Sequence, residues 1–149
     1  VENRHGALSR IANLFSSRGY NISSLNVAET EDASISRMTI VVAGDEDVLD
    51  QVVKQLNKLI DVIKVIDFRD EPVIDRELLM MRADASRATR HELIELAGVF
   101  GAKIAAVSAS SITIELTSTT QMIDDFIGLV KPYGIKEIVR SGRVALARR

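Results

Sequence analysis

The two halves of this chain repeat one order of helix-forming and strand-forming segments, and this repeat is the feature that most constrains the fold. Each half follows the order β-α-β-β-α-β, provided that the opening strand of the first half precedes Val1. Glu71-Pro72 lies between the halves and is the one convincing linker signal, because proline disfavours helix and cannot donate to a strand ladder. The sequence therefore predicts an α+β protein with two tandem ferredoxin-like domains, 1–70 and 71–149.

In the first half, apolar residues at helical spacing predict a helix that begins after Gly6 and stops at Gly19. A second helix begins at the acidic residues Asp45 to Asp47, where capping and the helix dipole favour carboxylates. Alternating apolar residues predict strands over 22–28, 35–42 and 62–68. Val1-Glu2 resembles the end of a further strand, so we expect the first strand to begin before Val1.

In the second half, the same reasoning predicts four strands and two helices. The strands cover 78–83, 104–108, 112–117 and 135–140, and the helices cover 93–100 and 122–130. Thr89 with Glu92, and Ser118 with Gln121, have the spacing of capping boxes and are expected to open the two helices.

The turn Asn3-Arg4-His5-Gly6 and the strand start at Asn21 form a candidate ligand site. Gly6 leaves space beside the backbone, and the free N–H groups of the following helical turn favour a carboxylate. The side chain of Asn21 can both donate and accept hydrogen bonds. The alternative is a purely structural role, in which Asn3, Gly6 and Asn21 are only cap and turn residues. Because the topology brings a turn, a helix start and a strand start to one edge of the sheet, we predict a site that binds an amino acid without reacting with it.

Composition excludes several classes of protein. With 149 residues and a net charge of −2, the chain is not a typical nucleic-acid-binding protein. It has no cysteine, which excludes disulfides, thiolate nucleophiles and cysteine-based zinc sites. No apolar run approaches the roughly 20 residues that cross a bilayer, and no signal peptide opens the chain. We therefore expect a soluble, intracellular protein without a membrane partner.

Residues that could perform catalysis or bind a metal are few. His91 falls in the first turn of a charged helix, where a surface role is expected, and His5 falls at the rim of the candidate site. No serine has a histidine or lysine arrangement beside it that marks a nucleophile, and no phosphate-binding loop is present. We predict no catalytic and no metal-binding residue.

RNA-recognition modules share this order of elements, so RNA binding is an alternative function. Such modules stack bases on aromatic residues of their central strands. The predicted strands here carry aliphatic residues, serine and threonine, and aromatic residues make up only 4% of the chain. The sequence therefore disfavours RNA as a ligand.

Seven segments, in order, resemble the small subunit of acetolactate synthase, whose first domain is an ACT domain. They cover residues 2–11, 14–22, 24–25, 36–40, 55–62, 75–78 and 140–146. The Asn-x-x-Gly turn alone would indicate only an ACT domain, and the later segments make the resemblance specific to this subunit family. His5 departs from the pattern, since such turns often hold a small residue or proline at that position.

The resemblance implies a non-catalytic regulatory subunit in branched-chain amino acid biosynthesis. Such a subunit binds and activates a catalytic subunit and confers feedback inhibition by a branched-chain amino acid, usually valine. Thiamine diphosphate, Mg²⁺ and FAD are expected in the catalytic partner, and no cofactor is expected in this chain. The implied location is the cytoplasm, or the plastid in a plant or alga.

The resemblance also assigns residues to the effector site. The expected contacts are Asn3, Gly6, Ala7, Leu8, Asn21, Ile22, Val27 and Ala28. The strand over 22–28 lies at a sheet edge, which invites pairing with a second copy and gives a homodimer with two equivalent pockets at the seam. The second half is expected to support dimerisation or to transmit the effector signal.

Two alternatives remain at this point. One is an ACT-type amino-acid sensor that controls a different enzyme. The other is a small acylphosphatase-like hydrolase, which would need an arginine-bearing phosphate loop before the first helix. The turn from Asn3 to Gly6 is a poor version of such a loop.

Overall fold

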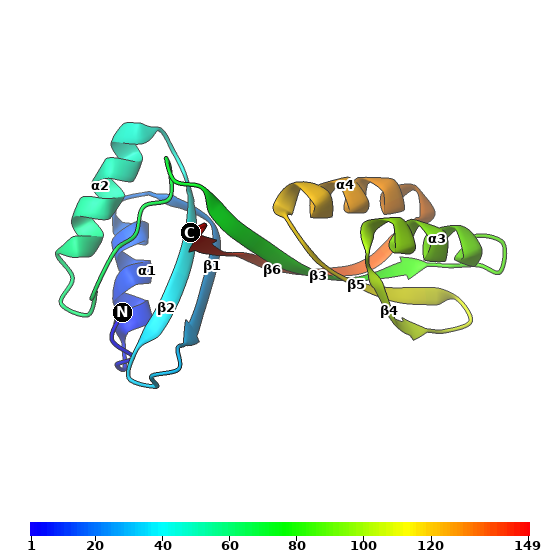
Figure 1. Cartoon of the computed structure of the whole chain (residues 1–149), viewed down its shortest axis with the longest axis horizontal. Helices are drawn as coiled ribbons and strands as arrows, with labels where there is room; N and C mark the ends of the chain where they lie inside the picture. The colour runs from blue at the N-terminus through cyan, green and yellow to red at the C-terminus, as the bar shows by residue number, and fades with distance from the viewer. The chain divides into compact units, whose positions relative to one another are not determined.

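A computed structural model describes all 149 residues and contains four α-helices and six β-strands. The chain divides into two compact units (Figure 1). Unit 1 comprises Val1–Ile74 together with Ala145–Arg149, and unit 2 comprises Asp75–Val144. None of the helices combines the length and the apolar character that spanning a membrane requires.

Unit 1 contains two helices on one face of a two-stranded antiparallel sheet (Figure 1). Its elements are α1 (Ala7–Ser17), β1 (Asn21–Glu29), β2 (Ser36–Ala43) and α2 (Glu46–Asn57). The register of the sheet runs from Asn21 opposite Ala43 to Glu29 opposite Ser36. Apolar residues of both helices form the buried centre of the core, against which strand side chains pack; the buried four are Ile11, Phe15, Val52 and Leu56.

The predicted strand over 62–68 does not form a ladder, so this prediction was wrong. Between this segment and β2 lie only Val1 and Glu2. Ser36 N–H donates to the Val1 carbonyl over 2.9 Å, and Glu2 N–H donates to the Asp61 carbonyl over 2.8 Å. Two residues provide a single isolated bridge, which is too little for a ladder. The alternating apolar residues are instead partly buried by packing, since Val62 and Val65 contact the core of unit 1.

Unit 2 has the βαββαβ order that the sequence predicts. Its elements are β3 (Val73–Asp84), α3 (Arg90–Phe100), β4 (Lys103–Val107), β5 (Ser111–Ser118), α4 (Thr120–Val130) and β6 (Ile135–Ala147), with a 3₁₀ turn at Lys131–Tyr133. The first two residues of β3 and the last three of β6 fall in unit 1. The sheet order β4-β5-β3-β6 is that of a ferredoxin-like domain. Both α3 and α4 cover one face, and residues such as Leu79, Leu93, Ile114 and Phe126 are fully buried between helices and sheet. The fold class is thus confirmed.

Both predicted capping boxes of unit 2 differ from the structure. The Thr89 hydroxyl does not cap α3, because it accepts a hydrogen bond from Ser86 N–H over 3.0 Å in the preceding turn. The cap of α4 is Thr119 rather than Ser118, and its hydroxyl accepts from Met122 N–H over 3.3 Å. Adjacent serine and threonine residues compete for the same backbone groups, so spacing alone does not select the capping residue.

Candidate functional site

The start of α1 has the geometry that an anion requires. Gly6 has a φ of 86°, in the left-handed region that favours glycine. No side chain caps this helix, whereas the Asp45 carboxylate caps α2. Ala7 N–H donates to the Arg4 carbonyl over 3.2 Å, so Leu8 and Ser9 provide the first-turn N–H groups that no side chain caps. The helix dipole adds a favourable field for negative charge.

Asn3 holds the turn against the β1–β2 hairpin. Its side-chain amide donates to Oε1 of Glu29 over 3.1 Å and to the Ala33 carbonyl over 2.9 Å. Its backbone N–H donates to the Ser34 carbonyl over 2.8 Å. With both amide protons engaged, the side-chain oxygen remains as an acceptor that suits an ammonium group.

Arg10 provides a cation beside Gly6. Its Nε donates to Oδ2 of Asp61 over 2.5 Å, and a Cβ added at Gly6 would lie 3.0 Å from Nη1 of Arg10. The Asp61 side chain is 3% exposed and that of Arg10 is 47% exposed. The hydrogen bond from Arg10 holds the pKa of Asp61 below its usual value. The guanidinium is thus fixed against the first turn of α1.

Sequence reasoning missed the pair of Arg10 and Asp61. The two residues are 51 positions apart. The only local signal is that Asp61 interrupts an apolar stretch, which indicates that its carboxylate needs a partner but not which cation supplies it.

The predicted site residues fall into two groups at opposite ends of β1. Asn3, Gly6, Ala7 and Leu8 lie at the hairpin end, where β1 also places Val27 and Ala28. Asn21 and Ile22 lie at the other end, eight residue steps of strand from Glu29, or about 26 Å. Because α1 runs the length of the sheet before the chain turns back, one small ligand cannot touch both groups within a single chain.

The side chains of these residues differ in accessibility. Leu8 and Val27 are 42% and 41% exposed and are available to a ligand, whereas Ala7 is buried beneath the first turn. Ile22 is half-buried and packs against the core of unit 1. Asn21 is exposed at the first position of β1.

Neither histidine takes part in this site as a buried acid or base. His91 lies on the surface of α3, as predicted, and its side chain is 82% exposed. Its Nε2 is 3.2 Å from Oε1 of Glu95. His5 is exposed in the turn before α1. No cluster of three histidine, cysteine, aspartate or glutamate residues could hold a metal ion.

Comparison with known proteins agrees with both units. A family described as an AHAS small subunit-like ACT domain matches residues 1–64, and a family described as the small subunit of acetolactate synthase matches residues 76–149.

Individual relatives match along nearly the whole chain. A probable acetolactate synthase small subunit from Archaeoglobus fulgidus is 49% identical, with 99% of this chain and 92% of that protein covered. The small subunit from Mycolicibacterium smegmatis is 44% identical, with 99% and 87% covered. The crystal structure of the small subunit from Thermotoga maritima superposes with a TM-score of 0.91 at 36% identity, over 100% of this chain and 93% of that one. The chain belongs to the acetolactate synthase small-subunit family.

Proposed function

We propose that this chain is the regulatory subunit of acetolactate synthase, which binds and activates the catalytic subunit and makes it sensitive to valine. The observation that carries the proposal is the uncapped start of α1 at Gly6, within a chain that matches small subunits in both units. The chemistry, with its thiamine diphosphate, Mg²⁺ and FAD, belongs in this proposal to the catalytic partner.

The separation of the two residue groups along β1 supports a site shared between two copies. β1 pairs only with β2, so its other edge carries no strand of this chain. Antiparallel pairing of two copies about a twofold axis at Leu25, the middle residue of β1, would place Asn21 of the partner subunit opposite Glu29. Asn3, which contacts Glu29, would then lie near Asn21 of the partner subunit. The symmetry yields two equivalent pockets.

An aliphatic amino acid matches the groups that such a pocket brings together. Its carboxylate would accept hydrogen bonds from the first-turn N–H groups of α1, and its ammonium would donate to the amide oxygen of Asn3. Its side chain would contact Leu8 and Val27, which are exposed in the single chain. A ligand at the seam stabilises one arrangement of the two subunits over others, and couplings of about 1–3 kcal/mol suffice for strong inhibition.

The direct test combines the chain with an acetolactate synthase catalytic subunit and measures the rate with and without valine. We expect the chain to raise the rate and valine to lower it again. Calorimetry of the chain alone should show heat with valine, and sedimentation should show a dimer. A rate unaffected by the chain would refute the regulatory assignment, and activation without a response to valine would refute the effector site alone.

A further inference from the structure

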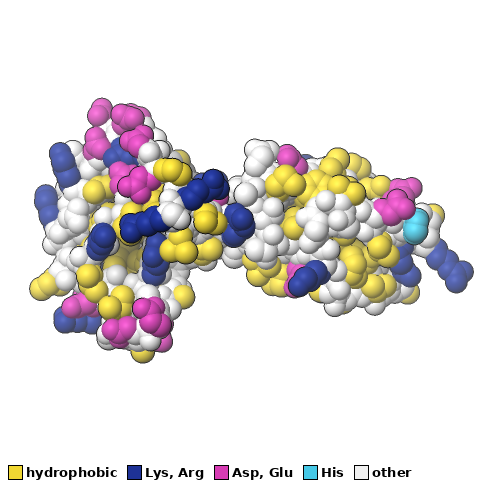
Figure 2. All heavy atoms as spheres, in the orientation of Figure 1, with side chains coloured by type: hydrophobic (Ala, Val, Ile, Leu, Met, Phe, Trp, Pro, Cys, Tyr) yellow, Lys and Arg dark blue, Asp and Glu magenta, His cyan; other side chains and the backbone are white.

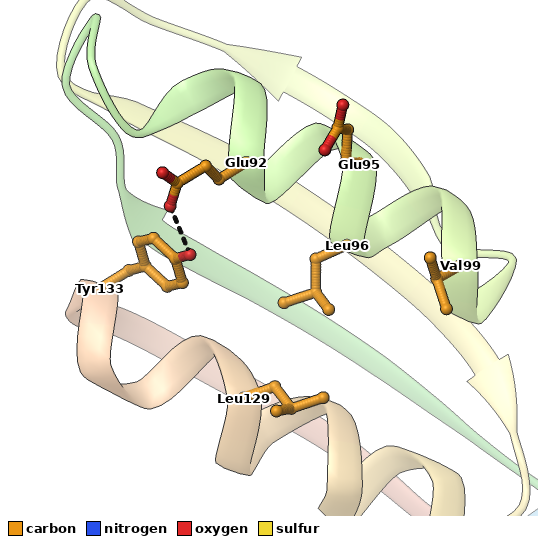
Figure 3. Close-up of a pocket in the computed structure, with 6 residues that line it drawn as sticks. All are labelled: Glu92, Glu95, Leu96, Val99, Leu129 and Tyr133. Carbon is orange, nitrogen blue, oxygen red and sulfur yellow. Dashed lines mark hydrogen bonds between the residues drawn. The ribbon is translucent and has the colours of Figure 1, made fainter.

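A groove runs between α3 and α4 on the surface of unit 2, whereas the residues assigned to the effector site belong to unit 1. Its volume is about 390 Å³. Six residues line it: Glu92, Glu95, Leu96, Val99, Leu129 and Tyr133 (Figure 3). All six come from the two helices or from the 3₁₀ turn that follows α4, so the groove belongs to the helical layer alone.

The apolar residues that line the groove are accessible. Val99 is 80% exposed and Leu129 is 51% exposed, and half-buried Leu96 lies between the helices. Figure 2 shows hydrophobic side chains gathered over these helices. Single exposed apolar residues are ordinary, but a group along one groove is typical of a surface that a partner covers.

The wall on α3 is acidic. Glu92 accepts a hydrogen bond from the Tyr133 hydroxyl over 2.6 Å, which fixes its carboxylate at the rim (Figure 3). This carboxylate also raises the pKa of Tyr133. Glu95 lies one turn further along α3, 3.2 Å from His91. The lining holds two carboxylates and no lysine or arginine, so it favours a cationic partner.

We propose that this groove docks an amphipathic helix of the catalytic subunit that carries lysine or arginine beside its apolar face. The inference rests on the proposed function, because it names the surface by which a regulatory subunit would hold its catalytic partner. A furrow between two helices accepts a third helix through apolar anchors spaced three or four residues apart, and Val99 and Leu129 provide the complementary surface. The carboxylates of Glu92 and Glu95 would pair with the partner's cations at the rim.

The same charges argue against a second copy of this chain as the occupant. A twofold contact through the groove with its axis near Glu92 and Glu95 would bring these carboxylates close to those of the other copy, and like charges across an interface are unfavourable. A partner of opposite charge removes this repulsion.

The test uses two substitutions in the groove, each with a matched control. Val99→Lys replaces an apolar anchor with a charge that repels a cationic helix, and Ile60→Lys makes the equivalent change at a site in unit 1 that is 86% exposed. Glu95→Lys reverses a rim charge, and Glu71→Lys makes the same change at an exposed residue outside unit 2. All four positions are exposed, so unfolding midpoints close to wild type are expected.

Each full-length variant is titrated into the catalytic subunit, and the concentration that gives half-maximal activation is measured. We expect V99K and E95K to raise this concentration by about tenfold or more, and I60K and E71K to leave it unchanged. The heat of valine binding should be the same in all four variants. If wild type activates and the groove variants activate at the same concentration, or if all four variants weaken alike, the groove assignment is wrong and the regulatory function stands. If wild type does not activate, both proposals fail.

Discussion

Arg140 on β6 donates two hydrogen bonds to Glu77 on β3. Its Nε donates to Oε1 over 2.6 Å and its Nη2 donates to Oε2 over 3.2 Å. The Glu77 side chain is only 4% exposed, and the Thr120 hydroxyl at the start of α4 also donates to it over 3.1 Å. This ion pair therefore joins the edge strand β6 to its neighbour β3 and to the start of α4.

Removing Arg140 should destabilise unit 2, because it takes two hydrogen bonds away from a buried carboxylate. We expect Arg140→Ala to lower the free energy of unfolding by about 2 kcal/mol, less than for a fully enclosed pair because Arg140 is 35% exposed. Arg82→Ala is the control, since its pair with Glu137 is exposed on both sides and should contribute less than about 1 kcal/mol. Chemical denaturation measures both values. Equal losses in the two variants would contradict the role assigned to the buried pair.

The same pair makes unit 2 sensitive to acid. The hydrogen bond from Arg140 lowers the pKa of Glu77 from its ordinary value of 4.5. A carboxylate whose pKa is lower in the folded state stabilises the fold above its ordinary pKa, and this contribution is lost as the pH falls toward the folded value.

Glu77→Gln isolates this effect from that of other carboxylates. The stability difference between wild type and E77Q should be constant above about pH 5 and should shrink as the pH falls below 4.5. Unfolding curves at a series of pH values measure the difference. A difference that stays constant down to pH 3 would show that Glu77 is not held in its ionised form by the fold.

Gly134, which precedes β6, should not tolerate a side chain. Its φ is 99°, and a Cβ there would lie 2.5 Å from Oδ2 of Asp84. We expect Gly134→Ala to cost about 1–3 kcal/mol through backbone strain and displacement of this carboxylate. Gly128→Ala in α4 is the control, because a Cβ there meets nothing within 4 Å and alanine is the better helix former. Thermal unfolding should show opposite signs for the two variants.

Gly6→Asp should abolish valine inhibition while activation of the catalytic subunit survives. The new carboxylate would repel the carboxylate of the effector. It would also lie beside Arg10 and pair with this guanidinium in place of the effector. Gly101→Asp is matched for backbone strain, since Gly101 has a φ of 72° with open space around it and lies at the end of α3 in unit 2, outside the residues assigned to the effector site. G101D should keep its response to valine. Unchanged inhibition in G6D would refute the assignment of the α1 start as the carboxylate site.

Local features of unit 1 were predictable because local geometry determines them. The first helix begins directly after Gly6, as predicted, and Asp45 caps the next helix by accepting from Val48 N–H over 2.9 Å. Both follow from the conformational and hydrogen-bonding preferences of a few adjacent residues. The element order of unit 2 was predictable for the same reason, since each element carries its own periodicity.

Features that depend on distant residues were not predictable. The alternating residues over 62–68 have strand character, but a ladder needs a neighbouring strand, and only Val1 and Glu2 occupy that position. β6 extends to Ala147, whereas the sequence predicts that this strand ends at Arg140. Its length depends in the same way on pairing across the sheet. The distance from Asn3 to Asn21 is likewise a property of the fold, because the helix between them spans the sheet.

That distance yields a sharp test of a shared effector site. If each pocket takes Gly6 from one copy and Asn21 from the other, G6D and Asn21→Ala homodimers should each lose valine binding. Subunit exchange between them should restore it in part, because one of the two pockets in each mixed dimer has both wild-type groups. With equal amounts and random exchange, half of the dimers are mixed, so about one quarter of all pockets should bind valine. Calorimetry after exchange measures this fraction.

The control for this experiment mixes G6D with Asn3→Ala, whose altered residues lie in the same turn. In this mixed dimer each pocket keeps one defect, since Asn3 and Gly6 reach a pocket from the same copy. No binding should return, although the dimers exchange equally well. Recovery in both mixtures would mean that the defects act through dimer stability rather than at the pocket. If valine binding returns in neither mixture, Asn21 acts in the same copy as Gly6. The length of β1 argues against that outcome. Only a seam formed by two copies predicts recovery with Asn21→Ala and none with Asn3→Ala.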